Sequence, residues 1–313
     1  MPLVSVVVPV YNKRQFLGEA LRSFDRQTYG RVEWILVDDG STDGSGGVLS
    51  SWVPRSGESR VVSKENGGAS SARNEGLRRA RGEFALFWDA DDLQDPRAIE
   101  RMVAAAACEH VNVVVSAIRR IRRDGSELDL FTCEGHAASS ERAIEEWLRG
   151  GVSTGPYSKL VRTSLLRDRS ISFEEGVINE DVMWTAELLG AAGTVYFIGE
   201  PLYHYVERPG SVALTTSLRL LDVFDNCSKL ESYIGGRFPN DTDACAEYCA
   251  GACLSVILAA ARGNARRAYP DLYARSMREL AERRADIRRF HRGIKDRIRI
   301  ALVELGLYGH IMR

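Results

Sequence analysis

The chain has 313 residues and a formal net charge of −1, and 44% of its residues are apolar while 27% are charged. This composition is typical of a globular protein and excludes a disordered or fibrous chain, and the length suggests two domains of about 150 residues each. Because the net charge is close to zero, the chain has no overall attraction to nucleic acid, and we expect no nucleic-acid partner.

Strands and helices are predicted to alternate over the first 90 residues. Apolar and largely β-branched runs predict buried strands over 3–10, 32–37, 60–63 and 83–88. Apolar residues at helical spacing predict a helix after Asn12, which can cap it, and a further helix over 70–81. This alternation indicates right-handed βαβ units. We therefore expect an α/β fold with a mostly parallel sheet that is flanked by helices.

The pattern changes after residue 115. The elements predicted there are a charged hairpin over 118–131 with its turn at Asp124-Gly125, a helix over 141–149, a loop over 153–160, and a helix beginning at 179–181. From residue 217 the chain is predicted to be wholly helical. A turn over 208–211 marks the change, so we expect one domain over 1–215 and a helical region over 216–313.

The six cysteines follow no recognisable disulfide framework. Because Met1-Pro2 leads directly into a strand-like segment, we expect no signal peptide. We therefore expect the reducing cytoplasm as the compartment. The longest apolar run, 250–261, is shorter than the ~20 residues that a membrane span needs. Cys245, Cys249 and Cys253 recur every four residues. They form either a metal site or, as we expect, a seam of small apolar side chains, because the outer two are ~12 Å apart along a helix.

Polar clusters follow three of the predicted strands. They are Pro9-Val10-Tyr11, Asp38-Asp39 and Asp89-Ala90-Asp91. In open α/β sheets, ligands bind at the carboxyl ends of the strands, so these clusters are predicted to meet at one site. The carboxylates of 89, 91 and 92 repel one another unless a helix N-terminus, a basic side chain or an external cation neutralises them.

Six short segments, in chain order, indicate a family. They are VSVVVPVYN, ILVDDGSTDGS, NGGASSARNEGL, FALFWDADD, INEDVMW and YVERPGSVA. Over residues 1 to about 215 the chain resembles the family 2 glycosyltransferases of GT-A fold. The resemblance implies a Rossmann-like nucleotide-sugar-binding domain. It also implies transfer of a sugar from a nucleotide-diphosphate donor, usually with inversion and with the help of a divalent metal.

The resemblance assigns the acidic motif after the fourth strand to the metal. It implies that Asp91 binds Mn²⁺ or Mg²⁺ directly and that Asp89 contacts the ribose or a metal-bound water, and carboxylate oxygens are the ligands that such hard cations prefer. His204 is either a further metal or phosphate contact or a structurally satisfied residue. For Asp92 and Asp95 the alternative is a place before a helix N-terminus, where acids are favoured.

The nucleotide is assigned to the ends of the first two strands. The resemblance implies that Asp39 accepts the N3 hydrogen of a uracil base and that Tyr11, beside the backbone of Pro9, stacks on the base. Tyr11 is otherwise an amphipathic residue at the rim, and Asp38 is expected to cap its turn.

Three basic residues are predicted to contact the donor. Arg73 either reaches the nucleotide or forms a structural ion pair with Asp38 or Asp89. Lys159 and Arg208 occupy family-like positions that suit diphosphate binding.

The resemblance also implies the catalytic base. Asp181 matches the aspartate of the family's base motif, and Glu180 is expected to hydrogen-bond the acceptor or the donor sugar. The alternative for Asp181 is a capping role at the start of its helix. A base within hydrogen-bond reach of its proton typically contributes ~10²–10⁴-fold to the rate.

The sequence thus predicts an inverting, metal-dependent glycosyltransferase. It would move a sugar from a UDP-sugar to an acceptor hydroxyl of a saccharide or lipid-linked acceptor, in cell-surface polysaccharide or glycolipid synthesis. The alternative is a non-catalytic nucleotide-sugar-binding protein of the same fold. A dinucleotide-dependent oxidoreductase or a nucleotidyltransferase lacks support, because the chain has neither a Gly-X-Gly-X-X-Gly turn nor a phosphate loop. Neither the sugar nor the oligomeric state can be predicted.

The tail over 281–313 is basic. It carries nine Lys or Arg against four acids, a net charge of +5. Apolar residues recur at helical spacing in it: Ile294, Ile298, Ala301, Leu302 and Leu305. This stripe either packs on the catalytic domain or lies on an anionic membrane surface. Our hypothesis is peripheral association with the inner membrane face.

Overall fold

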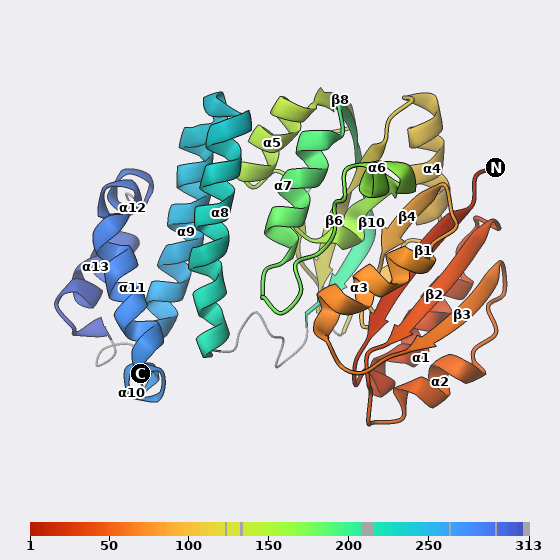
Figure 1. Ribbon diagram of the computed structural model, residues 1–313, viewed down its shortest axis with the longest axis horizontal. Coiled ribbons are helices and arrows are strands. Elements are labelled where there is room, and N and C mark those ends of the chain that lie inside the picture. The colour runs from red at the N-terminus through yellow and green to blue at the C-terminus, as the bar shows by residue number, and fades with distance from the viewer. Residues whose placement is uncertain (123, 132–133, 208–215, 263, 292, 309–313) are drawn as a thin grey trace. The chain divides into compact units, whose positions relative to one another are not determined.

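The structure is a computed structural model of the chain (Figure 1). It describes residues 1–122, 124–131, 134–207, 216–262, 264–291 and 293–308. The chain divides into two compact units, one with residues 1–176 and 180–209 and the other with residues 177–179 and 210–313. The turn that we predict over 208–211 lies outside the described residues, so the division at residue 215 stays a prediction.

The first half of the first unit is a parallel sheet of four strands in the order β3-β2-β1-β4. The strands are β1 (Val4–Val10), β2 (Val32–Asp38), β3 (Glu58–Ser63) and β4 (Phe84–Phe87). The two central strands are almost fully buried, because helices cover both faces of a parallel sheet and select β-branched, apolar residues. All four predicted strands are therefore present, with ends within two residues of the prediction.

The connecting helices are α1 (Arg14–Asp25), α2 (Ser45–Ser51) and α3 (Gly68–Arg79). On one face of the sheet, Phe24 of α1 stacks on Trp34 with ring centroids 5.0 Å apart, and Trp88 lies 5.7 Å from Phe24. The prediction that Asn12 caps α1 is wrong. Asn12 has a φ of 51°, and its side-chain oxygen accepts from the backbone N–H of Thr42 at 2.9 Å instead.

The second half of the sheet is mixed and continues in the order β4-β9-β6-β10-β5. Its elements are β5 (Leu93–Gln94), α4 (Ala98–Cys108), β6 (Val113–Ile121), β7 (Glu127–Phe131), β8 (His136–Ser139), α5 (Ser140–Leu148), η1 (Pro156–Ser158), β9 (Lys159–Arg162), α6 (Thr163–Asp168), α7 (Asp181–Ala191) and β10 (Thr194–Val206). The predicted hairpin is the antiparallel pair β6–β7, with Gly125 in its turn at a φ of 84°. The predicted loop over 153–160 instead contains η1 and runs into β9, which pairs antiparallel with both β4 and β6.

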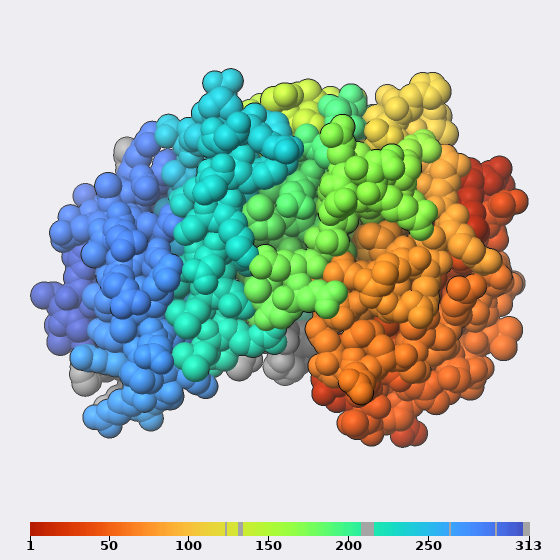
Figure 2. Space-filling view, in the orientation of Figure 1, coloured from red at the N-terminus to blue at the C-terminus, as the bar shows by residue number. Residues whose placement is uncertain are grey.

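The second unit is helical, as predicted. Its elements are η3 (Leu218–Leu220), α8 (Leu221–Arg237), η4 (Pro239–Asp241), α9 (Thr242–Ala260), α10 (Ala265–Ala268), α11 (Pro270–Glu282), α12 (Arg284–Phe290) and α13 (Ile294–Glu304). Helices α8 and α9 lie side by side (Figures 1 and 2). Cys245, Cys249 and Cys253 are buried on α9, and Cys249 Sγ lies 3.8 Å from the carbonyl of Cys227 on α8. This is the small-residue seam that the spacing predicts.

One described segment, Pro239–Ala260, is long and apolar enough to cross a membrane by length and composition. It was not predicted, because its apolar residues do not form one continuous run. Half of the segment is buried, and its helix α9 packs against α8, α11 and α12 of the same unit. A core helix of a globular domain has the same properties, so the segment is weak evidence for a membrane span.

Candidate active site

The ends of three parallel strands meet at one edge of the sheet, as the sequence predicts. Val10 is in register with Asp38, and Val7 is in register with Phe87. Backbone hydrogen bonds extend both pairings past the strand ends, from Asp39 N–H to Val10 at 2.8 Å and from Trp88 N–H to Val7 at 3.0 Å. The acidic clusters after β2 and β4 are therefore held at the same edge, with the turn after β1 between them.

Two of the three crowded carboxylates at this edge have a basic partner. Lys13, just before α1, forms an ion pair with Asp91. On α3, Arg73 contacts Asp89 at 3.1 Å. These contacts reduce the mutual repulsion of the acidic residues after β4. The ion pair with Asp89 is one of the two alternatives that the sequence left open for Arg73.

Arg73 also joins two acidic motifs that are 91 residues apart in the sequence. Its Nη1 donates to Glu180 Oε1 at 2.6 Å, while Nη2 donates to Asp89 Oδ1 at 3.1 Å, and its guanidinium lies 5.3 Å from the ring centroid of Phe173. The side chain is only 8% exposed. Burial alone lowers the pKa of an arginine, but the charges of Asp89 and Glu180 outweigh it and raise the pKa of Arg73. It therefore stays charged and fixes both carboxylates.

Asp181 opens α7, directly after Glu180. Burial is the main cause that raises the pKa of Asp181 to about 6, and the neighbouring charge of Glu180 adds to it. The charges of Arg73 and Lys159 act in the opposite direction. A carboxylate with a pKa near neutrality can accept a proton during a reaction and release it afterwards.

The charges of the site leave room for a divalent cation. Five carboxylates and three basic side chains form the network, an excess of two formal negative charges: Asp39, Asp89, Asp91, Glu180 and Asp181 against Lys13, Lys64 and Arg73. Within the described part of the chain, no group of three or more His, Cys, Asp or Glu is arranged to hold a metal ion. The excess of negative charge and the carboxylate oxygens fit Mg²⁺ or Mn²⁺ that is held by one or two carboxylates and completed by ligand oxygens and water, rather than by a cage of protein ligands alone.

His204 is not brought together with these carboxylates. It lies in β10, paired with Leu93 of β5. Burial is the main cause that lowers its pKa, and the charge of Arg119 contributes. The choice between a metal or phosphate contact and a structurally satisfied histidine therefore stays open.

The ammonium group of Lys159 is bonded within its own loop. This arrangement does not support its predicted contact with a diphosphate. The side chain is fully buried, and its Nζ donates to the carbonyls of Ser153, Thr154 and Gly155 at 2.6, 3.2 and 2.7 Å. Burial lowers the pKa of Lys159 to about 7. Because Thr185 of α7 donates to the same Thr154 carbonyl at 2.7 Å, Lys159 secures a loop that is bonded to the helix of Asp181.

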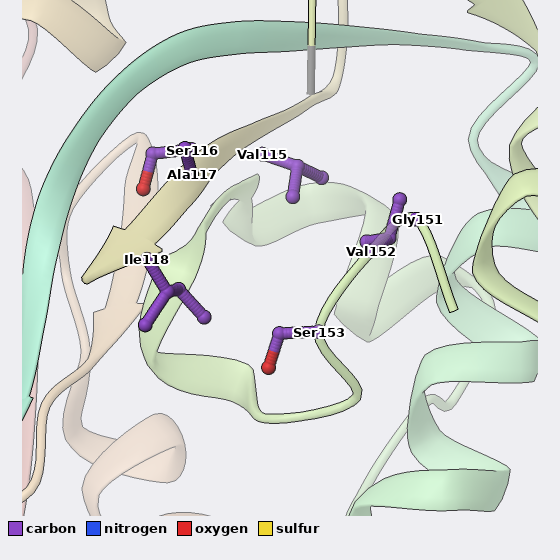
Figure 3. Close-up of a pocket in the computed structure, with 7 residues that line it drawn as sticks. All are labelled: Val115, Ser116, Ala117, Ile118, Gly151, Val152 and Ser153. Atoms are coloured by element: carbon purple, nitrogen blue, oxygen red, sulfur yellow. The ribbon is translucent and has the colours of Figure 1, made fainter. Parts of the chain in front are cut away.

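This loop also borders a small, shallow recess (Figure 3). Its walls are residues 115–118 of β6 and residues 151–153 of the loop. They carry no titratable side chain, and the recess is distinct from the acidic edge.

Asp39 has its oxygens engaged by its own chain. The carboxylate accepts from the backbone N–H of Gly67 at 3.0 Å and of Gly68 at 2.7 Å and from Lys64 Nζ at 2.7 Å, and the residue is 2% exposed. Gly68 has a φ of +87°, a conformation that favours glycine. The predicted hydrogen bond to a nucleobase would therefore share the Asp39 carboxylate with these contacts.

The other predicted nucleotide contacts lie beside it. Tyr11 is 48% exposed at the end of β1, and its ring is available to a ligand. Pro9 lies in β1, in register with Val37 of the neighbouring strand β2. Asp38 caps its turn as expected, because its Oδ1 accepts from Ser41 N–H at 3.0 Å. Arg208 lies outside the described residues.

Asp92 is buried and does not cap α4. Its carboxyl group accepts from the hydroxyl of Tyr203 at 2.6 Å and from the backbone N–H of Val206 at 2.8 Å. Burial raises the pKa of Asp92, and the charges of Asp89 and Asp91 add to this rise. Asp92 thus ties the acidic motif to β10. Asp95 lies in the turn before α4, where its Oδ1 accepts from Arg97 N–H at 2.8 Å.

Lys13 and Lys64 were missed in the sequence. Both are basic residues that follow predicted strands at the same sheet edge as the acidic clusters. That position was the available signal, because a cation in such a turn lies within reach of the carboxylates.

Acidic residues at the carboxyl ends of parallel strands, with an aspartate of raised pKa beside them, form a site that suits a ligand bound at the edge of the sheet, as in enzymes of the α/β class. Residues 5–165 match the family described as Glycosyl transferase family 2, which is about half of the chain. The protein belongs to this family, which confirms the resemblance found in the sequence.

Relatives support the assignment. The chain is 31% identical over 223 residues to the glycosyltransferase GlyG of Streptococcus pneumoniae, covering 68% of this chain and 73% of GlyG. It is 30% identical over 217 residues to EpsJ of Bacillus subtilis, an uncharacterized glycosyltransferase, covering 68% of this chain and 63% of EpsJ. The matched region thus spans about three-fifths of EpsJ.

Solved structures share the fold. Residues 1–349 of TarS from S. aureus, in complex with UDP-GlcNAc, superpose with a TM-score of 0.72 at 21% identity over 98% of this chain and 88% of that one. The mannosyltransferase PcManGT of Pyrobaculum calidifontis, in complex with GDP-Man and Mn²⁺, gives a TM-score of 0.55 at 18% identity over 99% and 86%. The predicted GT-A-like α/β fold with a C-terminal helical region is confirmed.

Proposed function

We propose that this protein transfers a sugar from a uridine diphosphate sugar to a hydroxyl group of a surface saccharide or glycolipid acceptor, with inversion at the sugar carbon. The observation that carries the proposal is the Arg73 bridge, which links the acidic residues after β4 to the Glu180-Asp181 pair. Through Arg73, the acidic residues that would hold the donor are joined to the pair that would supply the proton acceptor, which supports one active site made of both motifs.

Each part of the site has a task in this reaction. Asp91 and Asp89 would hold Mg²⁺ or Mn²⁺. Such a metal stabilises the negative charge of the leaving diphosphate. Tyr11 offers its exposed ring to the base of the donor. Glu180, held by Arg73, would hydrogen-bond the reacting sugar or the acceptor.

Asp181 is the general base in this scheme. Its pKa of about 6 leaves it ionised at neutral pH, so that it can take the proton of the acceptor hydroxyl as that oxygen attacks the anomeric carbon. The nucleotide diphosphate leaves from the opposite side. A single displacement of this kind inverts the configuration at the carbon.

The relatives support the substrate class. TarS was solved with UDP-GlcNAc and PcManGT with GDP-Man and Mn²⁺. The chain is also 28% identical over 212 residues to TarS of Staphylococcus aureus, which is named a poly(ribitol-phosphate) β-N-acetylglucosaminyltransferase. This relative supports a polymeric acceptor for the present protein as well.

The proposal is tested with a panel of nucleotide-sugars in the presence of Mn²⁺ or Mg²⁺. Donor hydrolysis and thermal shift are followed for UDP-sugars and for GDP-mannose, with and without EDTA. We expect at least one UDP-sugar to raise the melting temperature and to be hydrolysed slowly in a metal-dependent manner. If no UDP-sugar stabilises the protein or is consumed, the proposed donor class is wrong. Stabilisation without any hydrolysis or transfer would favour a non-catalytic nucleotide-sugar-binding protein.

A further inference from the structure

Helix α13 has two apolar faces, and only one of them is packed. Ile300 and Val303 are buried, with 3% and 2% of their surface exposed. On the other face Ile294, Ile298 and Leu305 are exposed by 78%, 53% and 70%. Of the two alternatives that the sequence left open for the apolar stripe of the tail, packing on protein thus accounts for only one face of the helix.

The exposed residues form a continuous stripe. At 100° per residue, positions 294, 298, 301 and 305 fall within about 60° of one another on an α-helix. Ile300 and Val303 fall on the opposite side. We call Ile294, Ile298 and Leu305 the α13 stripe.

The flanks of the α13 stripe are basic. On the same helical wheel Lys295 lies on one side of the stripe, about 100° from Ile294, and Arg297 lies about 60° away on the other side. In the part of the chain that the structure describes, neither residue makes an ion pair. Glu304, at the edge of the stripe, contacts Arg284 and Arg288 of α12 at 3.1 and 3.2 Å, so its charge is compensated.

We propose that the α13 stripe docks on an anionic lipid surface, with α13 lying parallel to the membrane plane. An exposed apolar face with cations along both edges is the pattern of helices that insert shallowly at the level of the lipid headgroups. Helix α13 has 11 residues and is ~16 Å long, so the three side chains of the α13 stripe contact a flat surface at the same time. Lys295 and Arg297 favour an anionic partner over a second copy of this chain, because a second copy brings like charges together.

The surface is distinct from the candidate membrane span. Helix α9 is half buried and has neighbours within its unit, whereas the α13 stripe is exposed. Docking through α13 thus requires no rearrangement of the helices α8, α9 and α11. None of its residues belongs to the proposed active site.

The test is co-sedimentation of the full-length protein with vesicles of phosphatidylcholine alone and with phosphatidylglycerol added. We expect binding to the anionic vesicles that weakens at high salt. The variant Ile294→Gln/Ile298→Gln/Leu305→Gln should bind at least about tenfold more weakly. Lys295→Gln/Arg297→Gln should lose up to about 25-fold, about fivefold for each cation, and much of the salt dependence.

A matched control is Val53→Gln, which removes an exposed apolar side chain from the other unit, where it is 83% exposed. It should bind as the wild type does. Circular dichroism and donor hydrolysis should be unchanged in all variants, which keeps loss of folding separate from loss of docking. No binding to anionic vesicles overturns the proposal, and so does equal binding of the α13 variants and the wild type. A dimer that dissociates in the triple variant, without lipid binding, would assign the stripe to a second copy instead.

Discussion

Replacing Asp181 by asparagine should remove activity and stabilise the fold at the same time. Its pKa is raised from the ordinary 3.8 to about 6 in the folded protein. A difference of about 2 pKa units corresponds to ~3 kcal/mol, an upper bound because part of the Asp181 side chain remains in contact with solvent, which screens its charge. A raised pKa means that the folded protein binds the proton more tightly than the unfolded chain does. The stability contributed by Asp181 is therefore fully present below pH 4 and is lost as the pH rises through about 6.

Asparagine has no charge to bury and fits the same space. The Asp181→Asn variant should therefore have a higher free energy of unfolding than the wild type at pH 8, by up to ~3 kcal/mol, and the difference should shrink between pH 6 and pH 4. In the same variant, transfer should fall by at least ~10²-fold, as expected for loss of a general base. In the wild type, kcat/KM should fall as the pH drops below about 6.

Chemical denaturation at pH 4, 6 and 8 and initial rates with the active donor measure both effects. Asp168→Asn, at the exposed end of α6, is the control and should change neither quantity. Donor binding should survive in Asp181→Asn, because its side chain is not assigned to the nucleotide. Normal transfer by this variant would leave Asp181 as a structural residue only. A variant that is equally or less stable at pH 8 would refute the argument from its buried charge.

Four further changes test the rest of the site. Asp91→Asn should abolish metal-dependent turnover while leaving the fold intact; turnover within a few-fold of wild type with the same metal dependence would contradict its role as ligand. Lys13→Met should tighten Mn²⁺ binding in the absence of donor, measured by calorimetry, because the cation that pairs with Asp91 is removed; unchanged affinity would speak against a metal at Asp91. Arg73→Lys should lower kcat at least ~10-fold, because an ammonium cannot hold Asp89 and Glu180 in the same fork geometry; wild-type kcat would exclude the bridge as a positioning element. Lys159→Met should lower the melting temperature, since three carbonyls lose their donor, with little change in KM for the donor; a large rise in KM would restore the diphosphate contact.

The parallel half of the sheet could be predicted because its information is local. Strand β1 and its neighbours are runs of β-branched residues between turn residues, and their alternation with helices dictates the topology. The 13 residues of β10 were missed. They contain Gly199-Glu200-Pro201, which has the composition of a loop, and the ladder with β6 tolerates it only through irregular register at Pro201. Such tolerance depends on the neighbouring strand and is not visible in the sequence.

The candidate site shows the same limit. The acidic motifs and their common edge were predictable from the strands that precede them. The pairing of each basic side chain with its carboxylate was not predictable, because Arg73 contacts Glu180, which is 107 positions further along the chain. The burial of Lys159 could not be predicted either. A lysine is usually exposed, and only the three carbonyls of the folded loop make its burial favourable.

The contacts of Asp39 have a consequence for how the protein can hold a diphosphate. The N-terminus of a helix carries a partial positive charge and free N–H groups, and many proteins bind phosphates there. At the start of α3 the N–H groups of Gly67 and Gly68 are already bonded to the Asp39 carboxylate, an anion built into the chain. The partial positive charge at the N-terminus of α3 is thus already neutralised by the Asp39 carboxylate. The positive charge that binds a diphosphate must therefore come from basic side chains and from a bound metal. Donor affinity should accordingly fall when divalent cations are removed.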